Sequence, residues 1–213
     1  MTDWEIVKQV GNYAAVVCPD ELGINPRTEF DHPCTMHFSL RNYDLGDEHE
    51  YEPDSIEDLI EVLTERHGEI LWRPVSAYIH SGISIWIGDP VNPFDLQGWD
   101  TGLLGIIYIT REQVLKEMNL KRMTKKARKW AYDYMEGEVE EYNCYLTGDA
   151  WGIGLAELDE DGEIIDVDDT CWGFFGKRWA IEEATNQLEY HIHSQEEDKW
   201  EKVQTMEVQY GVE

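Results

Sequence analysis

The chain has 213 residues, of which 17 are Lys or Arg and 45 are Asp or Glu, so its formal net charge is −28 at pH 7. Its length suits one domain of ordinary size, and its charge argues against direct binding to nucleic acid, phosphorylated ligands or an anionic membrane. The absence of a signal-peptide pattern, and of any apolar run near the roughly 20 residues that span a bilayer, predicts a cytoplasmic protein without a membrane segment.

The N-terminal third predicts strands joined by turns. The strand-like segments WEIVKQV and NYAAVVC meet at Gly11 and Asn12, which favour a β-hairpin turn because both residue types tolerate positive φ. Residues 20–33 contain two prolines and are expected to form a loop, followed by a strand over CTMHFSL. The turn LRNYDLGDEHEY (40–51) comes next, and Asp44 and Asp47 in it are expected to accept from their own downstream N–H groups.

The middle of the chain predicts one helix and further strands. DSIEDLIEVLTERHG (54–68) has apolar residues at helical spacing and ends at Gly68. VSAYIHSGISIWIGD (75–89) contains two strand-like runs broken at Ser81 and Gly82, and LLGIIYIT (103–110) is typical of a buried strand.

The C-terminal half predicts three helices around a hairpin. Thr110 and Thr124 are expected to cap a short and a long helix, and the long one could divide at Gly137. DEDG (159–162) predicts the turn of a hairpin over 150–175, and a helix over 177–193 follows. The element order predicts an α+β fold, a mostly antiparallel sheet with three to four packed helices, in a single domain over residues 1–194; residues 195–213 are expected to be an acidic C-terminal strand or tail.

Charge is unevenly distributed along the chain. Residues 1–120 hold 7 basic and 22 acidic positions, and residues 130–213 hold 4 and 23, whereas residues 121–129 hold 6 basic positions and no acidic one. The basic island KRMTKKARK could hold a phosphate or contact nucleic acid, but with so much negative charge elsewhere it is expected to pair with the protein's own acidic tail or with a second subunit, which leaves a homodimer open. Nine tryptophans exceed the usual need of such a core, so some are expected at the surface, where aromatic residues anchor protein interfaces.

No familiar metal or nucleotide motif is present. The four cysteines have no CxxC spacing and are expected to be buried free thiols; they are Cys18, Cys34, Cys144 and Cys171. Cys171 is expected to be a small core residue beside Trp172. The HxxxH, HExxH, DxDxDG, GxGxxG and Walker patterns are all missing. The sequence therefore predicts no metal, no cofactor and no catalytic residue. His49 and His80 are expected to satisfy turn carbonyls or buried polar groups.

Five blocks in chain order carry a resemblance: LRNYDLGDEH, HSGISI, GWDTGLLGIIYIT, YLTGDAWG and CWGFFG. Together they resemble a family of uncharacterised accessory proteins of bacteriophages and other mobile elements, whose members carry NLGDEH, HSG, WDSGxxGxIYV, YLTGDxxG and CWGFxG blocks. The resemblance covers roughly residues 35–190. Thr101, Ala150, Trp151 and Phe175 depart from the family's usual residues but keep size and turn chemistry. The resemblance implies a phage or plasmid origin and no particular activity.

Two functional hypotheses follow. The first is a non-enzymatic anti-defence protein that mimics the charge of nucleic acid and inhibits a basic, nucleic-acid-handling host protein, such as a CRISPR effector or a restriction enzyme. The alternative is a small enzyme or sequestering protein for a nucleotide-like signal, with a pocket around His49, His80, Asp100, Asp149 and Cys171. The candidate partner-binding carboxylates of the first hypothesis are Asp47, Glu48, Glu136, Glu138, Glu140, Glu141, Asp159, Glu160 and Asp161.

Overall fold

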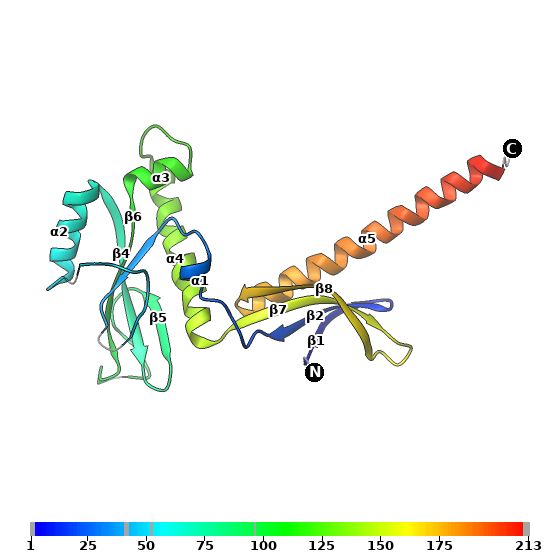
Figure 1. The fold of residues 1–213 in the computed structure, drawn as a ribbon, viewed down its shortest axis with the longest axis horizontal. Coiled ribbons are helices and arrows are strands. Elements are labelled where there is room, and N and C mark those ends of the chain that lie inside the picture. The colour runs from blue at the N-terminus through cyan, green and yellow to red at the C-terminus, as the bar shows by residue number, and fades with distance from the viewer. Residues whose placement is uncertain (1–2, 41–42, 52, 96, 211–213) are drawn as a thin grey trace. The chain divides into compact units, whose positions relative to one another are not determined.

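The computed structural model describes residues 3–40, 43–51, 53–95 and 97–210, and these form two compact units. Unit 1 comprises Met1–Gly23 and Gly148–Glu213, and unit 2 comprises Ile24–Thr147, so unit 2 is inserted into the chain of unit 1. Each unit contains one four-stranded antiparallel sheet, and the predicted α+β class is confirmed with two sheets in place of one (Figure 1). The single domain over residues 1–194 stays a prediction.

Unit 1 is a sheet covered by one long helix. Its elements are β1 (Glu5–Val10), β2 (Tyr13–Pro19), β7 (Ala150–Leu158), β8 (Ile164–Phe175) and α5 (Lys177–Tyr210), and the strand order is β1-β2-β7-β8. Gly11 with φ +63° and Gly162 with φ +84° lie in the two hairpin turns. Both hairpins are confirmed, because these turns need the positive φ that glycine adopts without strain.

The core of unit 1 follows the two-residue period of β2. Ala15 and Val17 face α5, where Ala180, Ala184 and Leu188 recur every fourth residue and are fully buried. Ala14 and Val16 point to the opposite face, where partly buried side chains such as Trp4 and Val167 cover them. Because successive side chains of a strand point to opposite faces, β2 buries apolar groups on both sides of the sheet.

The C-terminal segment differs from the prediction of a strand or tail. Helix α5 continues without interruption from Lys177 to Tyr210. Residues 195–210 contain neither glycine nor proline and are rich in Gln, Glu and Lys, which are good helix formers. The first glycine is Gly211, and residues 211–213 lie outside the described part of the chain.

Unit 2 places a sheet between two helices. Its elements are α1 (Pro26–Glu29), β3 (Thr35–Phe38), α2 (Ile56–His67), β4 (Ile70–Ile79), β5 (Ile83–Ile87), β6 (Thr101–Thr110), α3 (Arg111–Glu117) and α4 (Lys125–Thr147), and the strand order is β3-β6-β4-β5. Helix α4 packs against one face of this sheet, and α2 packs against the other through Leu59 and Leu63 on Ile106 (Figure 1). The strands and helices predicted for this region are confirmed, and α1 is an additional helix.

The helix boundaries of unit 2 follow their local signals. Ser55, Thr110 and Thr124 each accept a hydrogen bond from a backbone N–H of the following turn. These caps satisfy donors that the first helical turn leaves without a partner. Helix α4 runs through Gly137 without a break, so the alternative of two helices is wrong. Helix α1 lies within the predicted loop, where Asn25 caps it and Pro26 occupies its first turn.

No helix in the described ranges is both long enough and apolar enough to cross a membrane.

Candidate functional site

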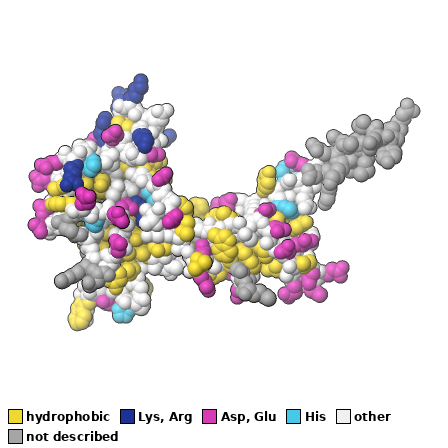
Figure 2. All heavy atoms as spheres, in the orientation of Figure 1, with side chains coloured by type: hydrophobic (Ala, Val, Ile, Leu, Met, Phe, Trp, Pro, Cys, Tyr) yellow, Lys and Arg dark blue, Asp and Glu magenta, His cyan; other side chains and the backbone are white. Residues whose placement is uncertain are grey.

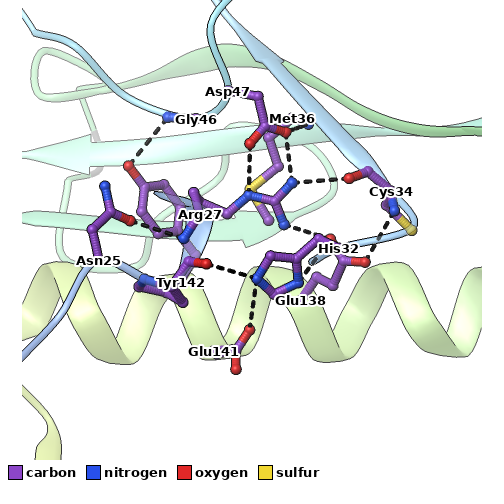
Figure 3. Close-up of polar contacts among 11 residues, drawn as sticks. Asn25, Arg27, His32, Cys34, Met36, Gly46, Asp47, Glu138, Glu141 and Tyr142 are labelled. Atoms are coloured by element: carbon purple, nitrogen blue, oxygen red, sulfur yellow. Dashed lines mark hydrogen bonds and ion pairs between the residues drawn. The ribbon is translucent and has the colours of Figure 1, made fainter. Parts of the chain in front are cut away.

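The LGDEH turn contributes a buried ion triad. Arg27 of α1 donates to both carboxylate oxygens of Asp47, from Nη2 at 2.6 Å and from Nε at 2.9 Å, and its Nη1 donates to Glu138 Oε2 at 2.5 Å (Figure 3). Only 2% of the Arg27 side chain and 3% of the Glu138 side chain are exposed. Asp47 and Glu138 therefore hold the fold together at this point, and of these two predicted contact residues Glu138 is buried whereas Asp47 is partly exposed.

The triad also binds the start of β3. Asp47 Oδ2 accepts from Met36 N at 2.7 Å, and Glu138 Oε1 accepts from Cys34 N at 3.1 Å. The expected Asx turn at Asp47 is therefore replaced by contacts to α1 and β3. Burial alone would lower the pKa of Arg27, but the hydrogen bonds and charges of Asp47 and Glu138 raise it overall, so the guanidinium stays charged.

Gly46 gives the same turn its shape. Its φ is +78°, and a Cβ at this position would lie 2.7 Å from Met36 O and 2.9 Å from Phe38 Cδ2. Its N–H donates to the Tyr142 hydroxyl of α4 at 3.1 Å. The turn thus brings Asp47 to Arg27 only while residue 46 lacks a side chain.

Replacing Gly46 with alanine is expected to lower the free energy of unfolding by about 1–3 kcal/mol, because the change combines backbone strain with a steric clash. Urea denaturation followed by circular dichroism measures this loss. Gly82→Ala is the control, since a Cβ there would meet no atom within 4 Å. Equal stability of the two variants would contradict the assigned role of Gly46.

Glu141 lies on α4 near His32, with 3.7 Å between Glu141 Oε2 and His32 Nε2. Burial raises the pKa of the Glu141 carboxyl, and the neighbouring Glu138 raises it further, while His32 and Arg27 act in the opposite direction. The folded protein therefore binds a proton at Glu141 more tightly than the unfolded chain does. Ionised Glu141 is consequently a cost to folding at neutral pH.

Glu141→Gln is expected to stabilise the protein at pH 7. A raised folded-state pKa favours folding below the ordinary carboxyl pKa of about 4.3, and this contribution is lost as pH rises through the folded-state value. The stability difference between variant and wild type should therefore grow from pH 4 to pH 8 in urea titrations. Glu140→Gln, an exposed position on the same helix, is the control and should show a flatter difference.

The remaining predicted contact carboxylates are exposed. Glu48, Glu136 and Glu140 lie on unit 2, and Asp159, Glu160 and Asp161 lie in the β7–β8 turn of unit 1. The turn belongs to a longer acidic stretch, which we call the acidic hairpin and define as residues 157–169. All eight of its carboxylates are exposed, and the stretch contains no Lys or Arg. The carboxylates are Glu157, Asp159, Glu160, Asp161, Glu163, Asp166, Asp168 and Asp169.

The acidic hairpin is held by its own hydrogen bonds. Asp159 Oδ1 accepts from Asp161 N and from Glu163 N, each at 2.9 Å. Strand β8 pairs only with β7 and forms the edge of the sheet, and its ladder is irregular near Asp169, which has φ +49°. Gln187 of α5 donates to the Asp169 carbonyl at 2.7 Å. These contacts hold the carboxylates of the acidic hairpin in place at the sheet edge. Figure 2 shows Asp and Glu side chains gathered on the surface of the face that it draws.

Three positions of the alternative hypothesis, His49, His80 and Asp100, lie in unit 2. The His49 ring packs edge-on against the His37 ring, with 3.6 Å between centroids, whereas His80 Nδ1 contacts Asp100 Oδ2 at 2.9 Å. His80 thus has a carboxylate partner, while His49 Nε2 is buried and has no hydrogen-bond partner in the described structure. The expectation that each histidine satisfies a polar group is wrong for that atom of His49.

The other two positions of the alternative hypothesis lie in unit 1. Asp149 accepts from Trp151 Nε1 at 2.5 Å and from Lys177 N at 3.2 Å, so it supports the start of α5. Cys171 is exposed, contrary to the expected core thiol, because β8 is an edge strand. Among the described residues, no three His, Cys, Asp or Glu side chains gather in a way that could hold a metal ion.

Two further surface predictions are confirmed in part. Trp99, Trp172 and Trp179 are exposed, as expected of some of the nine tryptophans. In the basic island, Arg128 pairs with Glu69 at 2.5 Å and Lys129 with Asp133 at 2.5 Å, so part of its charge is neutralised internally. The homodimer stays a prediction.

Neither a protein-family model, nor a curated protein, nor a solved structure matches the chain. The resemblance to phage and mobile-element proteins therefore stays a prediction, and the functional argument depends on the site's own chemistry.

Proposed function

We propose that the protein is a phage or mobile-element anti-defence protein that occupies the basic, nucleic-acid-binding groove of a host protein and inhibits it. The observation that carries this proposal is the acidic hairpin, which has eight exposed carboxylates within residues 157–169 and no Lys or Arg in that stretch. A partner for this surface needs a row of Lys or Arg side chains. Such rows are typical of grooves that bind phosphate backbones.

The spacing of charge on the hairpin supports the same partner. A strand advances about 3.3 Å per residue, and one strand of B-DNA carries a phosphate about every 3.4 Å along its axis. Asp166, Asp168 and Asp169 place three carboxylates within four residues of β8. Because successive side chains of a strand point to opposite faces, Asp166 and Asp168 lie on one face about 6.6 Å apart, which is close to the spacing of every second phosphate in one DNA strand.

The anchoring of the hairpin matters for affinity. Binding loses less conformational entropy when charged groups are already held in place. The Asp159 hydrogen bonds and the Gln187 contact to Asp169 provide such anchoring in the free protein. Unit 1 as a whole has 5 basic and 22 acidic residues, so its field also steers a cationic partner toward it.

The class of partner follows from this chemistry and from the resemblance. A phage or plasmid gene product that covers a basic groove would protect the mobile element against a nuclease of the host cell. CRISPR effectors and restriction enzymes are the two classes of host nuclease proposed, and the host cytoplasm is the proposed location. The proposal needs no catalytic residue, metal or cofactor in this chain.

The experiment is affinity capture from a bacterial lysate on the immobilised full-length protein, at about 50 mM and about 500 mM NaCl, a range over which phosphate-like contacts weaken strongly. We expect recovery of a basic nuclease at low salt, its loss at high salt, and its elution by duplex DNA. The captured nuclease should lose DNA binding when the protein is added. Recovery of no nucleic-acid-binding protein at either salt, or elution that DNA does not promote, would contradict the proposal.

A further inference from the structure

A second surface feature lies on unit 2, along one side of α4. A cavity of about 490 Å³ opens there between α4 and the segment that follows α1. Its aromatic walls come from Phe30, Trp130 and Tyr134, and carboxylates such as Asp31 and Glu141 lie at its border. Its volume lies within the range of about 300–1,000 Å³ that is usual for binding pockets.

The aromatic walls are open to solvent. Phe30 is 43% exposed and Tyr134 is 40% exposed. Trp130 and Tyr134 lie one helical turn apart on α4, with their ring centroids 5.0 Å from each other. Aromatic rings that are exposed around a hollow can interact with a cation, because the face of each ring carries partial negative charge.

The charge around the cavity favours the same kind of ligand. Four carboxylates line it, from Asp31, Asp133, Glu138 and Glu141. Arg27 neutralises Glu138 from inside the fold, and Lys129 pairs with Asp133 at the surface. Among the described ion pairs, none engages Asp31, and that of Glu141 is with His32. Burial raises the pKa of Glu141, and a bound cation would offset that cost.

Gly137 keeps the cavity open. It lies inside α4, where glycine is less favourable than alanine, and a Cβ there would meet no atom within 4 Å. Space for a side chain is therefore present and unused. A larger residue at this position would occupy part of the cavity, and its Cβ would meet no other atom within 4 Å.

We propose that this cavity binds an arginine side chain of the partner protein, an inference that rests on the proposed function because it names a contact on that same basic partner. A guanidinium stacks flat on aromatic rings, is more weakly hydrated than an ammonium group, and pairs with a carboxylate through two parallel hydrogen bonds. The combination of aromatic walls with a half-buried carboxylate therefore selects arginine over lysine. The acidic hairpin and the arginine cavity are separate contacts.

The test uses the full-length protein labelled with fluorotryptophan, with the Trp130 resonance assigned through Trp130→Phe. The probes are two capped peptides of equal charge. One alternates glycine with four arginines, and the other alternates glycine with four lysines. A salt concentration of about 150 mM screens non-specific electrostatic association with the acidic protein. We expect a saturable shift of the Trp130 resonance with the arginine peptide and a several-fold weaker response with the lysine peptide. Gly137→Leu should weaken the arginine response at least tenfold.

Gly137→Ala is the matched control, because it improves helix propensity as leucine does but leaves most of the cavity open; it should bind the arginine peptide as the wild type does. The proposal would be overturned if Gly137→Leu bound the arginine peptide as tightly as the wild type does, or if that peptide caused no shift of the Trp130 resonance. It would also be overturned if the lysine peptide gave an equal shift, or if spermidine alone gave one.

The two proposals fail differently. If neutralising the hairpin abolishes nuclease capture but Gly137→Leu binds the arginine peptide as the wild type does, the proposed arginine cavity is wrong and the proposed inhibitor function is supported. If the arginine peptide shifts the Trp130 resonance and Gly137→Leu abolishes this shift, but the wild type captures no nuclease, the arginine cavity is supported and the proposed inhibitor function is wrong.

Discussion

Replacing Arg27 with methionine is expected to lower the free energy of unfolding by about 3–5 kcal/mol, because it leaves the carboxylates of Asp47 and Glu138 without their buried counter-charge. Such a loss approaches the whole stability of many domains, about 5–15 kcal/mol. Urea denaturation followed by circular dichroism, with tryptophan fluorescence as a second probe, measures it. Arg27→Lys should fall between wild type and Arg27→Met, because lysine keeps the charge but cannot make the forked contacts.

Arg66→Met is the matched control for this prediction. Arg66 is exposed and lies over the Tyr51 ring at 6.0 Å, so its loss should change stability by about 1 kcal/mol or less. Adding Asp47→Asn and Glu138→Gln to Arg27→Met should recover part of the loss, since the stranded charges are then gone. An Arg27→Met protein as stable as Arg66→Met would show that the triad does not hold α1, β3 and α4 together.

The elements that sequence reasoning predicted correctly have local causes. The turn at Gly11 needs only a residue that tolerates positive φ, and the DEDG turn ends in a glycine for the same reason. The helix that begins at Ile56 is set by a Ser55 cap and ends where Gly68 has φ +73°. Signals within one or two turns of the chain suffice for such elements.

The ion triad has no such local cause. Arg27 is 20 residues from Asp47 and 111 residues from Glu138, and no spacing rule relates positions so far apart. One usable signal was present on α4: Glu138 lies on the same helical face as the buried Ala131, Met135 and Tyr142. A carboxylate on an apolar face predicts a buried partner, and this pattern could have indicated that Glu138 makes a buried ion pair.

The errors in unit 1 have a different origin. Residues 195–213 were expected to be an acidic strand or tail, but residues 195–210 continue α5, since their helix propensity is high whatever their net charge. Cys171 was expected in the core from residue type alone, whereas exposure on β8 depends on its being the edge strand. The pairing order of strands in a sheet is a tertiary property, and composition does not determine it.

Neutralising the tip of the acidic hairpin with Asp159→Asn, Glu160→Gln and Asp161→Asn is expected to weaken binding to the captured nuclease about 10- to 100-fold at low salt. Each exposed charge pair contributes about 0.5–1 kcal/mol, and each 1.4 kcal/mol is a factor of ten. Asparagine at position 159 keeps an oxygen that can accept from the N–H groups of Asp161 and Glu163. Stability should therefore hold or rise, as like-charge repulsion falls. Surface plasmon resonance over a salt series measures the affinity.

A second triple variant separates a fixed contact surface from net charge. The variant Glu57→Gln, Glu61→Gln and Glu65→Gln also removes three negative charges, but from exposed positions of α2 in unit 2. Charge that only steers the partner changes the association rate, whereas charge in the contact itself also changes the dissociation rate. We therefore expect the α2 variant to associate slightly more slowly and the hairpin variant to dissociate faster. Equal effects of both variants on association alone would mean that the partner senses the protein's overall field and not the ordered hairpin.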